Sequence, residues 1–157
     1  GDRIHMQVNT ENVANAIKSG DTYKIGKANV VRGGSDATIV TWGAMVHVAL
    51  KAAETLSNEG KEIEVVDLRT LAPFDAATCV NSVSRTGRLL VLQEAQYTGG
   101  LGHTVSSRIQ EQCFWNLEAP PIVVGALDTP VPFAPTLEDH TIPTAELVEK
   151  HLRNLCA

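Results

Sequence analysis

Short apolar runs alternate with segments of helical periodicity along most of this chain. Four runs are rich in β-branched and aliphatic residues and are bounded by glycines or polar residues, which is typical of strands that are buried on both faces. These predicted strands cover residues 37–42, 63–68, 88–93 and 122–124. A fifth β-prone run, over residues 28–31, precedes them and ends just before Gly33.

The segments between these runs predict helices. In the first of them, residues 45–58, Val46, Leu50, Ala53 and Leu56 repeat at helical spacing and trace one face. Gly60 then stands where a C-terminal cap is expected.

Three more helices follow. Asp75 is placed to cap a second helix that Gly87 ends, residues 105–114 predict a third, and Thr144 is placed to cap a fourth. The fourth helix has one apolar face, to which we assign Leu147, Val148, His151, Leu152 and Leu155.

Alternation of strands and helices predicts an α/β fold, a three-layer α/β/α sandwich around a mostly parallel sheet of about five strands. The run at 28–31 has no crossover helix before the next strand. A parallel neighbour would need such a helix, so we expect this run to form an antiparallel edge strand.

The chain has 157 residues, a length that suits one domain with its own core. We interpret residues 1–6 as a vector remnant ending in an initiator-like Met6, and residues 7–26 as a polar tail or linker, within which a short helix over 11–18 would fit. Residues 27–157 are the predicted domain.

Charge and composition exclude several classes of protein. A net charge of −5 gives no basic footprint for nucleic acid. No apolar run approaches the ~20 residues that cross a bilayer, and we recognise no signal peptide. Three cysteines without close Cys/His spacing fit neither a zinc site nor a disulfide framework, so we expect reduced thiols in an intracellular compartment.

The segment Gly99-Gly100-Leu101-Gly102 is a candidate phosphate-binding loop, because a glycine-rich turn before a helix can cradle a phosphate. The dinucleotide fingerprint requires a third glycine, and Val105 occupies that position. The alternative is a loop whose glycines permit positive φ angles and close packing, and we favour it.

His103, beside this loop, is a candidate general base or contact residue. No nucleophile elbow of the Gly-x-Ser-x-Gly type accompanies it. The residues alone therefore predict an α/β domain without an evident catalytic, cofactor-binding or metal-binding set.

Several spaced motifs carry a family resemblance. Residues 32–43 (RGGSDATIVTWG), 67–75 (DLRTLAPFD), 117–120 (LEAP) and 128–134 (DTPVPFA) follow one another in the chain. In this order they resemble the transketolase C-terminal domain, in the version found in the beta subunits of thiamine-diphosphate-dependent 2-oxo acid dehydrogenases. The resemblance covers about residues 24–157.

The resemblance implies a division of labour. In such enzymes an N-terminal domain of the beta subunit and an alpha subunit hold thiamine diphosphate and magnesium. The C-terminal domain contacts the alpha subunit and a second beta subunit, and it docks the peripheral-subunit-binding domain of the acyltransferase core. We therefore expect this chain to be inactive alone, to bind no cofactor itself, and to belong in a bacterial cytoplasm or a mitochondrial matrix.

The resemblance also implies roles for particular residues. An acidic residue of the Leu-Glu-Ala-Pro motif and the chain-terminal carboxylate would pair with basic residues of the acyltransferase, which gives Glu118 and Ala157, with Glu111 as a weaker neighbour. Subunit contacts are expected from Arg69, Asp75, His103 and Phe133. The family often has a small or acidic residue at the position of His103, so this chain departs from the pattern there.

Two other hypotheses stay open. The chain could be the equivalent domain of a transketolase or of a deoxyxylulose-phosphate synthase, although the motifs at 67–75 and 128–134 argue against both. It could also be an independent nucleotide-binding module, against which the missing third glycine argues.

Overall fold

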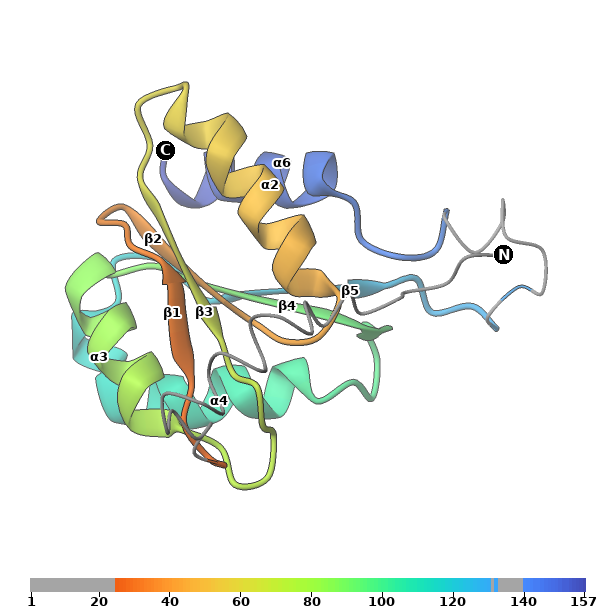
Figure 1. Cartoon of the computed structure of the whole chain (residues 1–157), viewed down its shortest axis with the longest axis horizontal. Coiled ribbons are helices and arrows are strands. Elements are labelled where there is room, and N and C mark those ends of the chain that lie inside the picture. Colours follow the sequence, from red (N-terminus) through yellow and green to blue (C-terminus); the bar gives the residue numbers. More distant parts are fainter. Residues whose placement is uncertain (1–24, 131, 133–139) are drawn as a thin grey trace, which may run out of the picture.

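A computed structural model describes residues 25–130, 132 and 140–157 of the chain. At its centre lies a five-stranded sheet in the order β1-β3-β2-β4-β5 (Figure 1). The strands are β1 (Asn29–Arg32), β2 (Ala37–Thr41), β3 (Ile63–Asp67), β4 (Leu89–Gln96) and β5 (Ile122–Ala126).

The strand directions confirm the predicted fold class. Strand β2 pairs in parallel with both β3 and β4, and β4 pairs in parallel with β5. Strand β1 pairs antiparallel with β3 at the edge of the sheet, as its short connection to β2 predicts. The four parallel strands thus run in one direction. The side of the sheet where they begin is here called the amino edge, and the side where they end is called the carboxyl edge.

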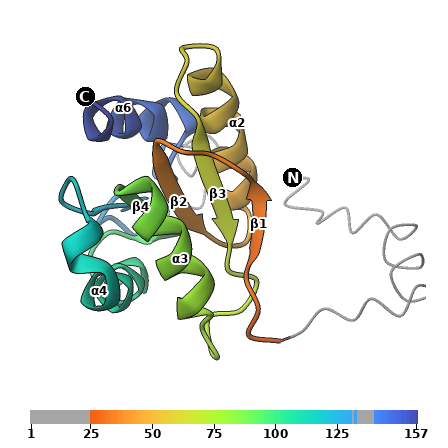
Figure 2. The same ribbon diagram turned by 90° about the vertical axis from the view of Figure 1, so that its left-hand side faces the viewer.

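Helices cover both faces of the sheet (Figure 2). Helix α2 packs against α6 on one face, and α3 packs against α4 on the other. Their bounds are α2 (Met45–Ser57), α3 (Ala76–Thr86), α4 (Gly102–Cys113) and α6 (Ala145–Leu155), and a short 3₁₀ helix η1 (Phe114–Asn116) follows α4.

Each parallel strand supplies side chains to two separate cores. Ile39 and Leu90 lie in the core beneath α2 and α6, while their neighbours Val40 and Val91 lie in the core beneath α3 and α4. All four are fully buried. Because successive residues of a strand point to opposite faces, a strand between two helical layers is buried on both sides and is therefore mostly apolar.

Several predicted details differ from the structure. Val46 and Leu50 are only half-buried, because α2 turns its smaller residues to the sheet. Leu147 of α6 is 39% exposed and so lies outside the core. The residue that caps the end of α2 is Asn58 rather than the predicted Gly60, which adopts a positive φ two residues later. The fully buried face of α2 consists of Met45, Ala49, Ala52, Ala53 and Leu56.

Elements near the glycine loop are also longer than predicted. Strand β4 continues to Gln96 instead of ending at Gln93, and α4 begins at Gly102 instead of Val105. The cap predictions at Asp75, Gly87 and Thr144 are confirmed, since both polar side chains accept a hydrogen bond from the third residue after them and Gly87 adopts a left-handed φ of 69°.

Asp75 joins three parts of the fold at the end of the 67–75 motif. Its carboxylate accepts hydrogen bonds from the backbone N–H of Thr78 (3.3 Å), the hydroxyl of Thr78 (2.8 Å) and the backbone N–H of Ala28 (3.1 Å). Lys27 Nζ lies 3.7 Å from the same carboxylate. This one side chain therefore caps α3 and ties the segment before β1 to the rest of the domain.

A buried polar cluster lies between β3 and α3. Glu64 is only 3% exposed, and it accepts hydrogen bonds from Ser82 and Arg85 of α3. The Ser82 hydroxyl also lies 2.8 Å from the hydroxyl of Thr38, on β2. A buried carboxylate is tolerated when it is paired and hydrogen-bonded in this way.

Replacing Asp75 by alanine should destabilise the fold. The variant loses the helix cap, and Ala28 loses a partly buried acceptor, so we expect a loss of about 2–3 kcal/mol in the free energy of unfolding at pH 7. Burial opposes ionisation of Asp75, but the hydrogen bonds from Ala28 and Thr78 outweigh it and hold the pKa of this carboxyl below its usual value. A lowered folded-state pKa stabilises the protein above the unfolded pKa of about 3.9 and stops doing so as the pH falls through the folded value.

Urea unfolding followed by circular dichroism at several pH values measures this effect. The gap between wild type and Asp75→Ala should be widest at neutral pH and should narrow below about pH 4. Asp75→Asn, which keeps an acceptor for the cap, should lie between the two. Equal unfolding midpoints for wild type and Asp75→Ala at pH 7 would contradict this role.

Candidate functional site

Glu118 lies at the amino edge, four positions before β5 begins. Its backbone N–H donates to the carbonyl of Gly87 (2.8 Å), and its carboxylate pairs with the guanidinium of Arg88 (2.8 Å). The Glu118 side chain is 60% exposed, whereas that of Arg88 is 26% exposed. The carboxylate is therefore held in place by a partly buried cation and remains open to a partner.

The C-terminus reaches the same edge. Lys61, just before β3, donates from Nζ to the backbone carbonyl of Cys156 (2.9 Å). Arg88 and the Cys156 thiol both contact the carbonyl oxygen of Asp36, at 3.5 and 3.9 Å. Figure 1 shows the C-terminus on the side where β4 and β5 begin. Cys156 and Arg88, the partner of Glu118, thus contact the same carbonyl oxygen. The exposed Ala157 follows Cys156 directly.

Glu111, the third predicted docking residue, is exposed on α4 and accepts a hydrogen bond from Ser107 (3.3 Å). The chain then passes through η1, where Phe114 is 53% exposed and Trp115 is 93% exposed. Sequence reasoning placed Phe114 at the end of a helix and did not single out Trp115. Adjacent aromatics at a helix end were a usable signal, because consecutive helical residues cannot share one buried face.

Arg69 and Asp75 lie at the carboxyl edge, in the turn after β3. Arg69 is exposed, adopts a positive φ of 57°, and donates its backbone N–H to the Asp67 carboxylate (3.0 Å). Asp75 is 5% exposed, and the hydrogen bonds of its carboxylate described above lie inside the domain. A subunit contact by either side chain stays a prediction.

His103 lies on the exposed surface of the first turn of α4. Its ring meets the ring of Tyr97 edge to face, with centroids 4.7 Å apart, and Tyr97 is itself 48% exposed. Thr98 next to it donates through its N–H and hydroxyl to Asp128 (2.8 and 2.6 Å), and these bonds lower the pKa of the Asp128 carboxyl. These two hydrogen bonds therefore join the loops that follow β4 and β5. The last predicted contact residue, Phe133, lies outside the described residues.

The glycine loop is built for packing. Gln93 is fully buried; its amide donates to the carbonyl of Gln96 (2.8 Å) and accepts from the N–H of Gly102 (2.6 Å). A Cβ atom added at Gly100 would lie 2.0 Å from the Gln93 side chain, and one at Gly102 would lie 2.8 Å from it. Gln93 thus occupies the N–H of Gly102 at the start of α4, and the two glycines leave room for its side chain.

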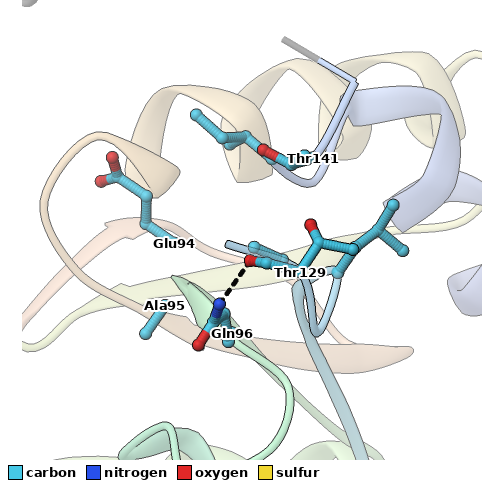
Figure 3. A pocket seen from close by; sticks show the side chains of 8 residues that line it. Glu94, Ala95, Gln96, Thr129 and Thr141 are labelled. Carbon is cyan, nitrogen blue, oxygen red and sulfur yellow. Dashed lines mark hydrogen bonds between the residues drawn. The ribbon is translucent and has the colours of Figure 1, made fainter. Parts of the chain in front are cut away.

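A cavity of about 330 Å³ opens at the carboxyl ends of β4 and β5 (Figure 3). On its floor Gln96 donates to the carbonyl of Thr129 (2.5 Å). None of the described residues that line it is a lysine, an arginine or a histidine. The side chains that define its character are those of Glu94, Gln96, Leu127, Thr129, Thr141 and Ile142.

Within residues 25–130, 132 and 140–157, no three His, Cys, Asp or Glu side chains converge as a metal site would require. The described helices include none with the length and apolar character needed to cross a bilayer. The three cysteines carry free thiols, and burial raises the pKa of Cys79 to about 12.

Comparison with known proteins shows which family the chain resembles in sequence and structure. Residues 26–148 match the family model described as the transketolase C-terminal domain. The chain is 51% identical over 120 residues to the beta subunit of acetoin:2,6-dichlorophenolindophenol oxidoreductase from Cupriavidus necator, a match covering 76% of this chain and 36% of the relative. It is 48% identical over 113 residues to the beta subunit of the pyruvate dehydrogenase E1 component from Bacillus subtilis, covering 72% and 35%.

A solved structure described as a split-gene transketolase, in the form of an inactive beta4 tetramer, superposes with a TM-score of 0.70 at 30% identity. That match covers 85% of this chain and 42% of the other. The chain therefore spans only about a third to two fifths of the length of these proteins. It belongs to the transketolase C-terminal domain family.

Proposed function

We propose that this chain serves as the subunit-assembly and acyltransferase-docking domain of the beta subunit of a 2-oxo acid dehydrogenase. The observation that carries the proposal is the meeting of Glu118 and the C-terminus at one edge of the sheet. The sequence motifs implied roles for both, although they lie 39 positions apart in the chain. The contacts through Arg88, Asp36 and Cys156 link them.

The chemistry of the amino edge suits a basic partner. Glu118 offers carboxylate oxygens whose position Arg88 holds, so little side-chain entropy is lost when a lysine or arginine of a partner approaches. The carboxylate of Ala157 adds a second negative charge. Clustered charges of this kind steer association and set the register of the partner, at a strength that depends on salt. We propose the peripheral-subunit-binding domain of the acyltransferase core as that partner, with Glu111 as an outlying contact.

We assign cofactor binding to other parts of the enzyme. Thiamine diphosphate and magnesium would be held by the N-terminal domain of the beta subunit and by the alpha subunit, and this domain would contact the alpha subunit and a second beta subunit. His103, Arg69, Asp75 and Phe133 are proposed for these subunit contacts. The two curated relatives named above come from bacteria, which favours a bacterial cytoplasm over a mitochondrial matrix.

The likeness to a split-gene transketolase favours a second candidate, the C-terminal domain of a transketolase. Identity is 30% to that structure and 48–51% to the dehydrogenase beta subunits, so we prefer the dehydrogenase. A transketolase domain has no acyltransferase to dock. Absence of binding to a peripheral-subunit-binding domain at low salt would therefore favour the second candidate.

Reversing the charge of Glu118 should weaken docking. For Glu118→Lys we expect the Kd for the cognate peripheral-subunit-binding domain to rise roughly tenfold or more at low salt, because an attractive charge becomes repulsive. Isothermal titration calorimetry measures this value. Glu94→Lys makes the same charge change at the carboxyl edge and should leave the Kd unchanged. Equal affinity for wild type and Glu118→Lys would count against the proposed site.

Moving the terminal carboxylate should have a smaller effect. Appending the neutral residues Gly-Ser-Gly after Ala157 keeps the charge but carries it beyond the edge. We expect the Kd to rise by roughly three- to tenfold, with a shallower dependence on salt. Measuring the Kd between about 20 and 300 mM salt separates the change in affinity from the change in salt dependence. A salt dependence that matches the wild type would show that the carboxylate does not take part.

A further inference from the structure

Trp115 is the most exposed large apolar side chain in the described part of the molecule, at 93%. Its backbone is nevertheless well fixed. Cys113 before it is buried in the core beneath α3 and α4, Leu117 after it packs against that core, and the N–H of Leu117 donates to the carbonyl of Phe114 (3.2 Å). The indole is therefore presented on a short rigid turn between two anchored residues.

Inside the described chain the indole meets only one ring. The Phe114 ring contacts it edge to face with centroids 5.2 Å apart and is itself 53% exposed. By contrast, Phe74 lies beneath the guanidinium of Arg108 at 5.0 Å. An exposed pair of large aromatics is typical of an interaction site, since a tryptophan contributes a large apolar area with few rotatable bonds.

Acidic side chains precede and follow this pair. Glu111 is exposed on the last turn of α4, and Glu118 is held at the amino edge by the hydrogen bond to Gly87 and by Arg88. Aromatic anchors surrounded by charged residues are the usual composition of binding hot spots. A second copy of this chain would bring like-charged carboxylates together at such a site, whereas a basic partner would bring opposite charges.

We propose that Trp115 is the apolar anchor of the docking surface, and that it receives an arginine of the basic partner on its indole face while Glu118 pairs with the positive charges beside it. The proposal rests on the docking function proposed above and adds the chemistry of the contact. Arginine suits the site better than lysine because its planar guanidinium stacks on an aromatic face and is more weakly hydrated.

Fluorescence isolates this contact, because the chain has only two tryptophans. In a Trp42→Phe background Trp115 is the sole indole, and its emission should lie near that of a fully hydrated tryptophan. Adding a tryptophan-free peripheral-subunit-binding domain should shift the emission to shorter wavelength and protect Trp115 from iodide quenching. An unchanged spectrum at saturation would overturn the proposal and leave the docking function standing.

Affinity provides the second readout. Trp115→Ala should raise the Kd roughly 10- to 100-fold, as loss of a hot-spot aromatic does, with Trp115→Phe between the two. The dependence of Kd on salt should be the same for Trp115→Ala as for the wild type, whereas it should be shallower for Glu118→Lys. Tyr97→Ala, at the carboxyl edge, is the matched control and should bind normally. Circular dichroism checks that each variant is folded.

The remaining outcomes also decide the question. Replacing each arginine of the partner by lysine in turn should reveal one position whose effect is coupled to Trp115→Ala in a double-mutant cycle. If no position is coupled, the arginine assignment fails. A shift of Trp115 emission on concentrating the chain alone would assign the surface to a second copy and overturn the proposal. Failure of the wild-type chain to bind at all would overturn the docking function together with it.

Discussion

Four parallel strands that are covered by helices on both faces constrain every other part of this domain. Ile39 and Val40 are consecutive residues, yet they are fully buried in different cores. Two pairs of helices must cover those cores, α2 with α6 and α3 with α4. Since the faces are closed, polar side chains that meet a partner are confined to the strand ends and the outer helix surfaces.

The two edges of the sheet use their polar side chains differently. At the carboxyl edge, Asp75, Asp128 and Gln93 direct their hydrogen bonds to backbone and side chains of the same domain. At the amino edge, Glu118 is exposed, and its partner Arg88 contacts the same carbonyl oxygen of Asp36 as Cys156 does. The first arrangement maintains the fold, and the second leaves charge for a partner. This division is why the amino edge carries the proposed docking function.

The fold class was predictable because its signals are strong and local. The continuous apolar strands, the caps at Asp75 and Thr144 and the short connection after β1 each have one simple structural solution. Of the face predicted for α2, Ala53 and Leu56 are buried, whereas Val46 and Leu50 were predicted wrongly, because the contact with the sheet is made largely by alanines. Small side chains permit close packing but give a weak periodic signal.

Other features depend on contacts between distant segments and leave no local pattern. In the sequence, Gln93 is simply the polar residue at the end of an apolar run. Only the folded loop shows that Gly100 and Gly102 pack against its amide. The order of the strands is likewise set by crossovers that periodicity does not encode. Trp115 would be assigned to a core by its type alone; its 93% exposure follows from the geometry of the turn after α4.

Backbone amide chemical shifts recorded while a peripheral-subunit-binding domain is titrated into the ¹⁵N-labelled chain test the central claim most directly. The account predicts shifts concentrated at the amino edge, in residues 87–88, 111–118 and 155–157, with little change at the carboxyl edge. Shifts concentrated in residues 94–101 and 126–129 instead would contradict it.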